Sequence, residues 1–368
     1  MSKIEELIEG LCPEGVEFRR LGEICEMRKG VQFNKKDMAE TGSYPVINGG
    51  INPSGYIEQY NESENTITVS QGGASAGYVN WQKVRFWAGA HCYVIRPLNS
   101  AALSNRYLYF FVKNNERDLQ QCQYGAGIPA LGRKELDNLS IPLPPLAVQE
   151  EIVRILDAFT SLEAELEAEL EARKKQYAYY RDTLLSFDSD DPKVEWKRLG
   201  EVVRGISSGK NKTRNNEGQY PVYGSTGIIA KTDEYVYDKK QILIARVGAY
   251  AGYVHIADCK YDVSDNAIIV DLKDEVSFKY IYHLLTNLGL NKFAKGGGQP
   301  LVTASQMKQI SIPLPPLSVQ HCIAETLDKF EALTSDLQSG LPAEIEARRK
   351  QYEYYRDRLL TFKVKSDE

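Results

Sequence analysis

Two long stretches of the chain carry apolar residues at steps of three and four, which is the spacing of one face of an α-helix. The first stripe contains Ile152, Ile155, Phe159, Leu162, Tyr177, Tyr180 and Leu184, and the second contains Ile323, Leu327, Phe330, Tyr352, Tyr355 and Leu359. We expect the two helices to pack against each other as an antiparallel coiled coil. A helix over residues 152–187 would be about 50 Å long, more than a helix lying on its own small domain needs.

The later part of the first stripe returns almost unchanged in the second. Residues 172–187, ARKKQYAYYRDTLLSF, recur at residues 347–362 as ARRKQYEYYRDRLLTF, with differences at only four positions. Within the second stretch, the repeat offset shifts by four residues between Leu337 and Ile345, in a segment that contains Gly340 and Pro342. Because glycine favours a helix end and proline a first helical turn, we predict that the second helix is kinked or broken near Gly340 and Pro342.

The repeat extends into the segments that precede the helices. Matches kept in one order along the chain indicate a duplicated unit, and here the matching pairs are residues 16–23 with 194–201, 73–79 with 248–254, and 141–146 with 312–317. The predicted fold is therefore α+β, with two similar β-rich domains, each followed by a long helix. The expected boundaries are residues 1–145 for the first domain, 146–187 for its helix, 188–316 for the second domain and 317–368 for its helix.

Short segments inside the first domain have strand-like composition. Residues 66–69, 77–81 and 91–96 are rich in β-branched and aromatic side chains, which favours strands. Ser104 and Ser277 each precede a helical pattern and can cap it. The repeated Leu-Pro-Pro-Leu segments cannot be helical, because proline disfavours the α-region for the residue before it. We therefore expect them to end each domain just before its long helix.

Composition describes an ordinary globular protein, with 42% hydrophobic and 26% charged residues. Apolar runs long enough to span a membrane, about 18 residues, are absent from the sequence, and the N-terminal segment lacks the apolar core of a signal peptide. The six cysteines are widely separated and form no Cys-x-x-Cys pair. This pattern predicts reduced thiols in the cytoplasm, no zinc site and no membrane partner.

The sequence gives little support to catalysis. Glu195 and Lys197 fit the Glu-x-Lys end of a metal-dependent nuclease site, but the matching residues of the first half are Glu17 and Arg19. A structural strand explains both copies, whereas a catalytic site explains only one. His91 aligns with Asn266, and a duplicated catalytic base would not be replaced in this way. We expect a chain without catalytic residues, metal or cofactor of its own.

Loops of the two domains differ in sequence but share a mixture of basic and amide side chains. Such side chains neutralise phosphates and form hydrogen bonds with base edges in the major groove of DNA. The net charge of −5 does not by itself indicate a nucleic-acid ligand, and for any single residue a solvated loop remains an open interpretation. The candidates for phosphate or guanine are Lys35, Lys36, Lys210, Lys212 and Arg214, those for base edges are Gln32, Asn34, Asn211 and Asn216, and weaker candidates in the Gly-rich loops are Gln71, Ser75, Arg246 and Tyr250.

The whole chain resembles the specificity subunit of type I restriction-modification systems. The resemblance rests on the domain beginnings (residues 18–23 and 196–201), the exits with Gln149 and Gln320, the Lys-Gln-Tyr-x-Tyr-Tyr-Arg-Asp helices, and the order of these pieces. It implies that each domain is a target-recognition domain for one half of a bipartite double-stranded DNA sequence, and that the helices set the gap between the halves. It also implies two methyltransferase subunits and two restriction subunits as partners, with S-adenosylmethionine, ATP and magnesium bound by those partners.

Two other functions remain open at this point. The duplicated domains could form a scaffold that binds proteins or glycans and has no affinity for DNA. A single-chain nuclease would depend on Glu195 and Lys197, and the duplication argues against it. Salt-dependent binding to DNA separates the first alternative from DNA recognition, and magnesium-dependent cleavage by the purified chain would establish the second.

Overall fold

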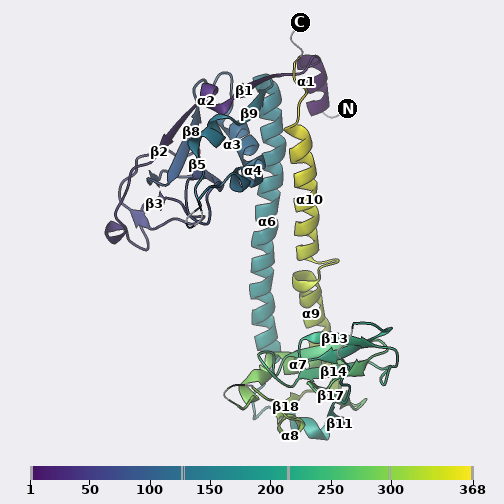
Figure 1. Ribbon diagram of the computed structural model, residues 1–368. Helices are drawn as coiled ribbons and strands as arrows, with labels where there is room; N and C mark the ends of the chain where they lie inside the picture. Colours follow the sequence, from purple (N-terminus) through teal and green to yellow (C-terminus); the bar gives the residue numbers. More distant parts are fainter. Residues whose placement is uncertain are drawn as a thin grey trace. The chain divides into compact units, whose positions relative to one another are not determined.

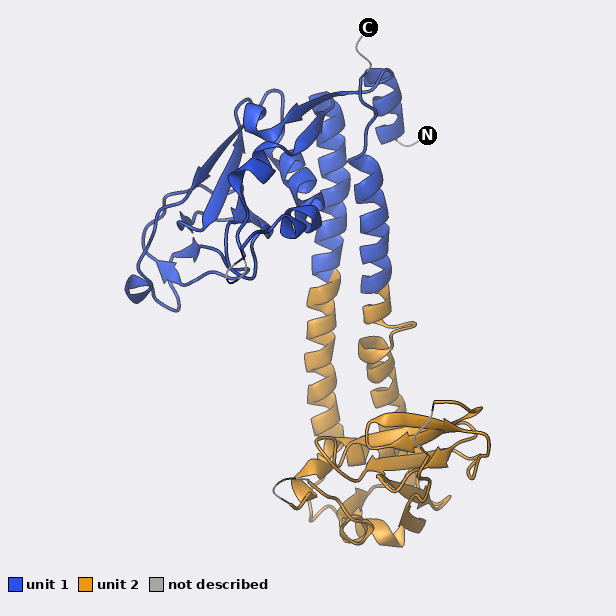
Figure 2. Cartoon of the chain, viewed as in Figure 1, with its two compact units in different colours: residues 1–165, 345–368 blue, residues 166–344 orange. Residues whose placement is uncertain are grey.

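The computed structural model describes residues 3–125, 127, 129–213, 216–296, 298 and 300–365 (Figure 1). The chain forms two compact units, of which unit 1 contains residues 1–165 and 345–368, and unit 2 contains residues 166–344 (Figure 2). Each unit combines a β-rich domain with parts of the long helices. The unit boundaries differ from the repeat boundaries in the sequence because the helix segments belong to the domain on which they pack.

Unit 1 contains a four-stranded antiparallel sheet in the order β2-β8-β5-β6, a three-stranded sheet β4-β3-β7 and a two-stranded sheet β1-β9. Its elements are α1 (Lys3–Leu11), β1 (Glu17–Arg20), α2 (Leu21–Ile24), β2 (Cys25–Lys29), η1 (Lys35–Asp37), β3 (Tyr44–Ile47), β4 (Tyr56–Ile57), β5 (Thr66–Ser70), β6 (Val79–Gln82), β7 (Trp87–Ala88), β8 (Cys92–Pro97), α3 (Asn105–Asn114), α4 (Glu116–Gln121), α5 (Arg133–Asp137) and β9 (Ser140–Leu143).

Unit 2 repeats this topology with sheets β11-β17-β14-β15, β13-β12-β16 and β10-β18. The predicted fold class is therefore confirmed. The elements of unit 2 are β10 (Glu195–Arg198), η2 (Leu199–Glu201), β11 (Val203–Ser208), β12 (Tyr220–Gly224), β13 (Gly227–Thr232), β14 (Gln241–Ala245), β15 (Val254–Ala257), β16 (Asp262–Val263), β17 (Ala267–Leu272), α7 (Phe278–Asn287), η3 (Leu290–Phe293), α8 (Ala304–Lys308), β18 (Ser311–Leu314) and α9 (Leu317–Ser335).

The long helices differ in continuity. Helix α6 (Leu146–Leu184) is one uninterrupted helix of 39 residues. The second long helix is divided: α9 ends at Ser335, and α10 (Leu341–Leu359) begins directly after an irregular segment formed by residues 336–340. A Cβ atom at Gly340 would lie 2.5 Å from the carbonyl oxygen of Ala332 and 2.8 Å from that of Asp336. Only glycine fits there. The break between α9 and α10 thus lies in the segment for which the sequence predicts it.

Helix–helix packing is antiparallel within each unit. In unit 1 the ring of Phe159 lies 5.6 Å from that of Tyr355, and Arg349 forms an ion pair with Glu163. Along these contacts the residue numbers rise in α6 and fall in α10, so the two helices run in opposite directions. In unit 2, Tyr177 and Tyr180 of α6 stack on Phe330 of α9, with centroid distances of 6.2 and 5.4 Å. Of the other stripe residues, Ile152, Ile323, Leu327 and Leu359 are buried, Ile155, Leu162 and Leu184 are partly buried, and Tyr352 lies 6.2 Å from Phe159.

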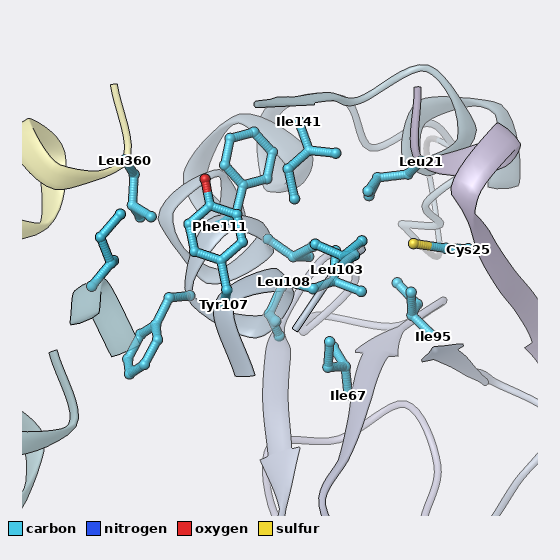
Figure 3. Packing of buried hydrophobic residues seen from close by; sticks show 14 of the residues in the cluster. Leu21, Cys25, Ile67, Ile95, Leu103, Tyr107, Leu108, Phe111, Ile141 and Leu360 are labelled. Carbon is cyan, nitrogen blue, oxygen red and sulfur yellow. The ribbon is translucent and has the colours of Figure 1, made fainter. Parts of the chain in front are cut away.

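The start of each long helix is fixed to its own domain by a buried core. In unit 1, Tyr107 and Phe111 of α3 lie between Leu360 and the sheet residues Ile67 and Ile95 (Figure 3). The Tyr107 hydroxyl donates to the carbonyl oxygen of Pro142 at 3.2 Å. Tyr280 makes the same bond to Pro313 at 2.9 Å in unit 2. The predicted serine caps are present, since the side chains of Ser104 and Ser277 accept from the backbone N–H groups of Tyr107 and Tyr280.

The core also explains the chemistry of the buried cysteines. Burial raises the pKa of Cys25 to about 12, so its thiol stays protonated at neutral pH. All six cysteines are free.

Over the described part of the chain, no helix has both the length and the apolar character needed to cross a membrane.

Candidate nucleic-acid interface

Loops of unit 1 converge at one end of the four-stranded sheet, where β2 and β5 end and β8 begins. We call this end of the strands, with its loops, the edge of the unit. The backbone N–H of Gly30, after β2, donates to the carbonyl oxygen of Cys92 at 3.0 Å. The N–H of Gln71, after β5, donates to the carbonyl oxygen of His91 at 2.8 Å. The basic loop that begins at Gly30 and the Gly-rich loop over residues 71–78 therefore leave the sheet side by side. The sequence predicts both loops, and the strand pairing brings them together.

Unit 2 repeats this arrangement bond for bond. The N–H of Gly209 donates to the carbonyl oxygen of Ala267 at 3.0 Å, and the N–H of Arg246 donates to that of Asn266 at 2.8 Å. The basic loop after β11 and the Gly-rich loop after β14 thus share one edge of the sheet β11-β17-β14-β15. Each unit therefore presents one such edge, with the same backbone frame and different side chains.

Two glycines fix the point at which the basic loops leave the sheet. A Cβ atom at Gly30 would overlap the carbonyl oxygen of Ala88, and one at Gly209 would overlap the carbonyl oxygens of Val263 and Ser264. The distances are far shorter than van der Waals contact, and the obstacles are backbone atoms that cannot rotate away. A side chain at either position would displace the loop, so glycine is required there.

The basic loop of unit 1 presents its candidate side chains to solvent. Asn34 precedes the short helix η1, which carries Lys35 and Lys36, and all three are exposed. The amide of Gln32 donates to the carbonyl oxygen of Phe33 at 3.0 Å and leaves its oxygen available. The loop is anchored at Trp87, whose indole N–H donates to the carbonyl oxygen of Val31 at 2.8 Å. Exposed lysine ammonium groups on an anchored loop suit contact with phosphates.

The basic loop of unit 2 divides its candidates into two groups. Lys210, Lys212 and Asn216 are exposed. Asn211 instead uses its side chain within the fold: its amide nitrogen donates to Asp262 at 2.7 Å, and its amide oxygen accepts from the N–H of Thr213 at 2.6 Å. A base contact by Asn211 would require one of these bonds to break. Arg214, which the sequence predicts as a phosphate or guanine contact, lies outside the described residues.

The Gly-rich loops place the remaining candidates beside the basic loops. Gln71 and Ser75 are partly buried in unit 1, as is Arg246 in unit 2. The guanidinium of Arg246 donates to the carbonyl oxygen of Asp265 at 3.0 Å. Tyr250 is 55% exposed and meets Tyr253 edge-on, at a centroid distance of 6.4 Å. Gly73 and Gly248 adopt φ of +83° and +80°, and a Cβ atom at either would meet nothing within 4 Å. The backbone at these points is open to close approach by a ligand.

A third segment at each edge is missing from the sequence prediction. The N–H of Gly73 donates to the carbonyl oxygen of Pro129 at 2.9 Å, and the N–H of Gly248 donates to that of Pro300 at 3.0 Å. The signal that could have revealed this segment is a Gly-x-Gly-x-Pro pattern present in both halves. It comprises Gly125, Gly127 and Pro129 in unit 1, and Gly296, Gly298 and Pro300 in unit 2.

Not every basic residue near these edges is available to a ligand. Arg28, at the end of β2, forms an ion pair of 2.7 Å with Glu62, which is only 2% exposed and also pairs with Arg96 at 2.8 Å. A buried carboxylate needs both partners, so Arg28 belongs to the fold. In unit 2, burial lowers the pKa of His255, whose hydrogen bond to the Ser225 carbonyl oxygen has the opposite effect but is long at 3.5 Å. Its imidazole is neutral at pH 7, and the exposed lysines supply the positive charge.

One cluster among the described residues has the ligand types and spacing of a metal site: His283, Asp328 and Glu331. Its groups are already partnered. The Nε2 atom of His283 and the ammonium of Lys279 lie 2.7 and 3.0 Å from Asp328, and the Tyr282 hydroxyl donates to Glu331 at 3.2 Å. An ammonium at this distance opposes a second cation. In unit 1 the equivalent ion pair joins Arg106 to Asp157 at 2.6 Å, so the cluster ties α7 to α9.

The nuclease candidates make the same structural contact in both units. Lys197 forms an ion pair of 2.9 Å with Glu195 on β10. Arg19 forms one of 3.2 Å with Glu17 on β1. These strands pair with β18 and β9 in identical register. The two copies are therefore equivalent strand residues, as the duplication predicts.

Comparisons with known proteins agree on one family. The sequence model for the type I restriction modification DNA specificity domain matches residues 13–172 and again 193–347. The chain is 32% identical over 393 residues to a putative type I restriction enzyme specificity subunit from Haemophilus influenzae, covering 98% of both chains. It is 32% identical over 411 residues to the specificity subunit of the type I restriction enzyme EcoR124I/EcoR124II from Escherichia coli, covering 98% of this chain and 97% of the relative. A crystal structure of the S subunit of a type I system from M. genitalium shares the fold, with a TM-score of 0.66 at 21% identity, covering 94% of this chain and 95% of that one.

Proposed function

The chain belongs to the family of type I restriction-modification DNA specificity subunits, and on that premise we propose that each of its units recognises one half of a bipartite double-stranded DNA target. The observation that carries the proposal is the convergence of loops at one sheet edge, which occurs in both units on the same backbone frame. A common frame with different side chains is what two readers of different half-sites require.

Each edge would divide its contacts between phosphates and bases. The exposed ammonium groups of Lys35 and Lys36 in unit 1, and of Lys210 and Lys212 in unit 2, would neutralise phosphates and fix the register on the duplex. Amide and guanidinium groups of the Gly-rich loops, such as Gln71 and Arg246, would contact base edges in the major groove. The open backbone at Gly73 and Gly248 would let these groups approach closely.

Catalysis would lie in other subunits. We propose that the chain is a non-catalytic scaffold for two methyltransferase subunits and two restriction subunits. The partners would carry S-adenosylmethionine, ATP and magnesium. The equivalence of Glu195 and Lys197 with Glu17 and Arg19 supports this division, because a strand repeated in both units needs no catalytic role.

A repeated exposed surface on the long helices supports the scaffold role. Lys175, Tyr179 and Asp182 of α6 lie on one helical face in unit 2, and Lys350, Tyr354 and Asp357 of α10 form the same face in unit 1. Tyr179 and Tyr354 are 66% and 60% exposed. Exposed tyrosines are enriched at protein interfaces. One such stripe on each unit fits one copy of the same methyltransferase partner per unit.

The proposed recognition is tested by giving the chain two copies of one reader. Residues 17–143 are replaced with a second copy of residues 195–314, cut at the equivalent strand pairs β1-β9 and β10-β18. The transplant is expected to fold, because Gln149 and Asp157 offer the same contacts as Gln320 and Asp328. Assembled with its methyltransferase partner, this chain should methylate a target in which the second half-site sequence has replaced the first.

Genome-wide mapping of methylated sites measures this outcome, with the unaltered chain as control. Loss of methylation at the original targets must be accompanied by new targets that keep the second half-site. An unchanged motif refutes the assignment of unit 1 to one half-site. An assembled chain with no salt-dependent affinity for DNA would instead support a scaffold that binds proteins or glycans.

The docking stripes give a separate prediction. Tyr179→Ser should remove one of the two methyltransferase copies, and Tyr354→Ser should remove the other, because each substitution deletes the largest exposed apolar group of one stripe. The double variant should bind neither copy. Native mass spectrometry of the reconstituted complex gives the number of copies, and Tyr235→Ser, at a 40% exposed tyrosine of unit 2 outside the helices, is the control. Full occupancy in the double variant would exclude the stripes as docking surfaces.

A further inference from the structure

The turn before one central strand carries a polar side chain at the same place in both units. His91 immediately precedes β8, and Asn266 immediately precedes β17. Ser70 is paired with Cys92, and Ala245 with Ala267. Continuing each register by one residue places Gln71 opposite His91 and Arg246 opposite Asn266. The backbone bonds of 2.8 Å from Gln71 to His91 and from Arg246 to Asn266 continue this pairing.

Cross-strand geometry places the side chains of each pair together. Residues directly opposite in an antiparallel pair point to the same face, with Cβ atoms about 5 Å apart. Gln71 and His91 therefore form one side-chain pair at the edge of unit 1, and Arg246 and Asn266 form the equivalent pair in unit 2. The guanidinium of Arg246 also bonds the carbonyl oxygen of Asp265 at 3.0 Å, which ties it to the turn that carries Asn266.

The turns that carry these side chains are held firmly. The N–H of His91 donates to the side-chain oxygen of Asn48 at 2.9 Å. The N–H of Asn266 donates to the hydroxyl of Ser264 at 3.2 Å, and the hydroxyl of Ser225 donates to its carbonyl oxygen at 2.9 Å. The side-chain polar atoms of His91 and Asn266 themselves form no hydrogen bond within the described part of the chain. A fixed backbone with an unengaged side chain is a good support for a recognition residue.

Each pair lies between the two loops of its edge. On one side the basic loop begins at Gly30 or Gly209, which bond to Cys92 and Ala267, the residues directly after His91 and Asn266. On the other side lies the open glycine of the Gly-rich loop, Gly73 or Gly248. The pair is therefore placed where a ligand that contacts both loops of an edge would come near it.

The chemistry of the pairs differs where the frame does not. An arginine donates two bonds to the O6 and N7 atoms of guanine, and an asparagine or glutamine bonds the N6 and N7 atoms of adenine. Histidine can donate or accept, depending on its tautomer. Arg246 with Asn266 suits guanine next to adenine, whereas Gln71 with His91 offers no guanidinium fork. The two edges would therefore prefer different bases.

We propose that His91 and Asn266 are specificity-determining residues that act with Gln71 and Arg246 as base-contacting pairs, one pair for each half-site. The inference rests on the proposed function and refines it. Each pair contacts the same base pair or two adjacent base pairs, and the identity of its side chains sets the bases preferred there.

The test exchanges the pairs between units in the full chain, assembled with its methyltransferase partner. One variant carries Gln71→Arg with His91→Asn, and the other carries Arg246→Gln with Asn266→His. Methylation of a DNA library randomised in both half-sites gives the base preference at every position. Each variant should change the preference at one or two adjacent positions of one half-site, by about 5- to 150-fold, and leave the other half-site unchanged.

Controls separate this inference from loss of folding and from failure of the proposed function. His91→Ala removes only an exposed side chain, so this variant should fold even if a double variant does not. It should weaken the discrimination between bases at one position of one half-site. His321→Asn, on an exposed histidine of α9, should leave both half-sites unchanged. Unaltered preferences in His91→Ala and in every folded exchange variant would overturn the inference. If the domain transplant nevertheless changes a half-site, the proposed function stands without it.

Discussion

Replacing Gln320 with leucine is expected to lower the free energy of unfolding of unit 2 by about 3 kcal/mol. Gln320 is 3% exposed. Its amide oxygen accepts from the N–H of Ser277 at 3.0 Å, and its amide nitrogen donates to the carbonyl oxygen of Pro315 at 2.8 Å, both in buried surroundings. Leucine fills the space but leaves both backbone groups without a partner. The effect should appear as a fall of about 8 °C in the melting transition of this unit.

Unit 1 offers the matching substitution. Gln149 accepts from the N–H of Ser104 at 2.8 Å and donates to the carbonyl oxygens of Pro144 and Ala102, at 2.7 and 2.9 Å. Gln149→Leu should destabilise unit 1 and leave unit 2 unchanged. Calorimetry resolves the two transitions if the units unfold independently, and hydrogen exchange at α3 and α7 assigns each loss to its unit. Gln219→Leu, at an exposed glutamine, is the control. Equal stability of Gln320→Leu and the control would refute this account of how the helix is fixed to its domain.

The duplicated fold could be predicted from the sequence because its signals are local. Steps of three and four along residues 152–184 indicate a helix, Ser104 and Ser277 are recognisable caps, and the offset around Gly340 marks the break between α9 and α10. The repeated exit segments also showed that Gln149 and Gln320 are equivalent. The bonds that these glutamines make could not be predicted, because Ser104 and Ser277 lie more than 40 residues away in the sequence.

The candidate interface was harder to predict because it depends on strand register. Gln71 lies opposite His91 only because Ser70 pairs with Cys92, and a shift of one residue would turn these side chains to the other face. Loop composition is also ambiguous about role. The amide of Asn211 could bond adenine, but the structure uses it to hold Asp262 and Thr213 in place. Composition therefore predicted candidate loops, whereas the hydrogen bonds of individual side chains required coordinates.

Replacing Gly209 with valine is expected to abolish recognition of one half-site. The new Cβ atom would overlap the carbonyl oxygens of Val263 and Ser264, so the basic loop after β11 and the turn before β17 must both move. That displacement disturbs the frame on which Lys210, Arg246 and Asn266 are placed. We expect affinity for the full target to fall at least about 100-fold, because loss of one half-site removes a large share of the specific binding. Competition between the full target and a target with one scrambled half-site measures this loss.

Strand β11, which directly precedes Gly209, contains a matched control. Gly205 lies four residues earlier in β11, and a Cβ atom there would meet nothing within 4 Å. Gly205→Val should therefore keep the full preference for the complete target, although it adds the same side chain only four residues away. Gly30→Val should mirror Gly209→Val at the opposite half-site, since a Cβ atom at Gly30 overlaps the carbonyl oxygen of Ala88. Binding to unrelated DNA should persist in all three variants, because the exposed lysines that we propose as phosphate contacts remain. If Gly209→Val distinguished the complete target from the half-scrambled one as well as Gly205→Val does, the sheet edge could not be the DNA-contacting surface.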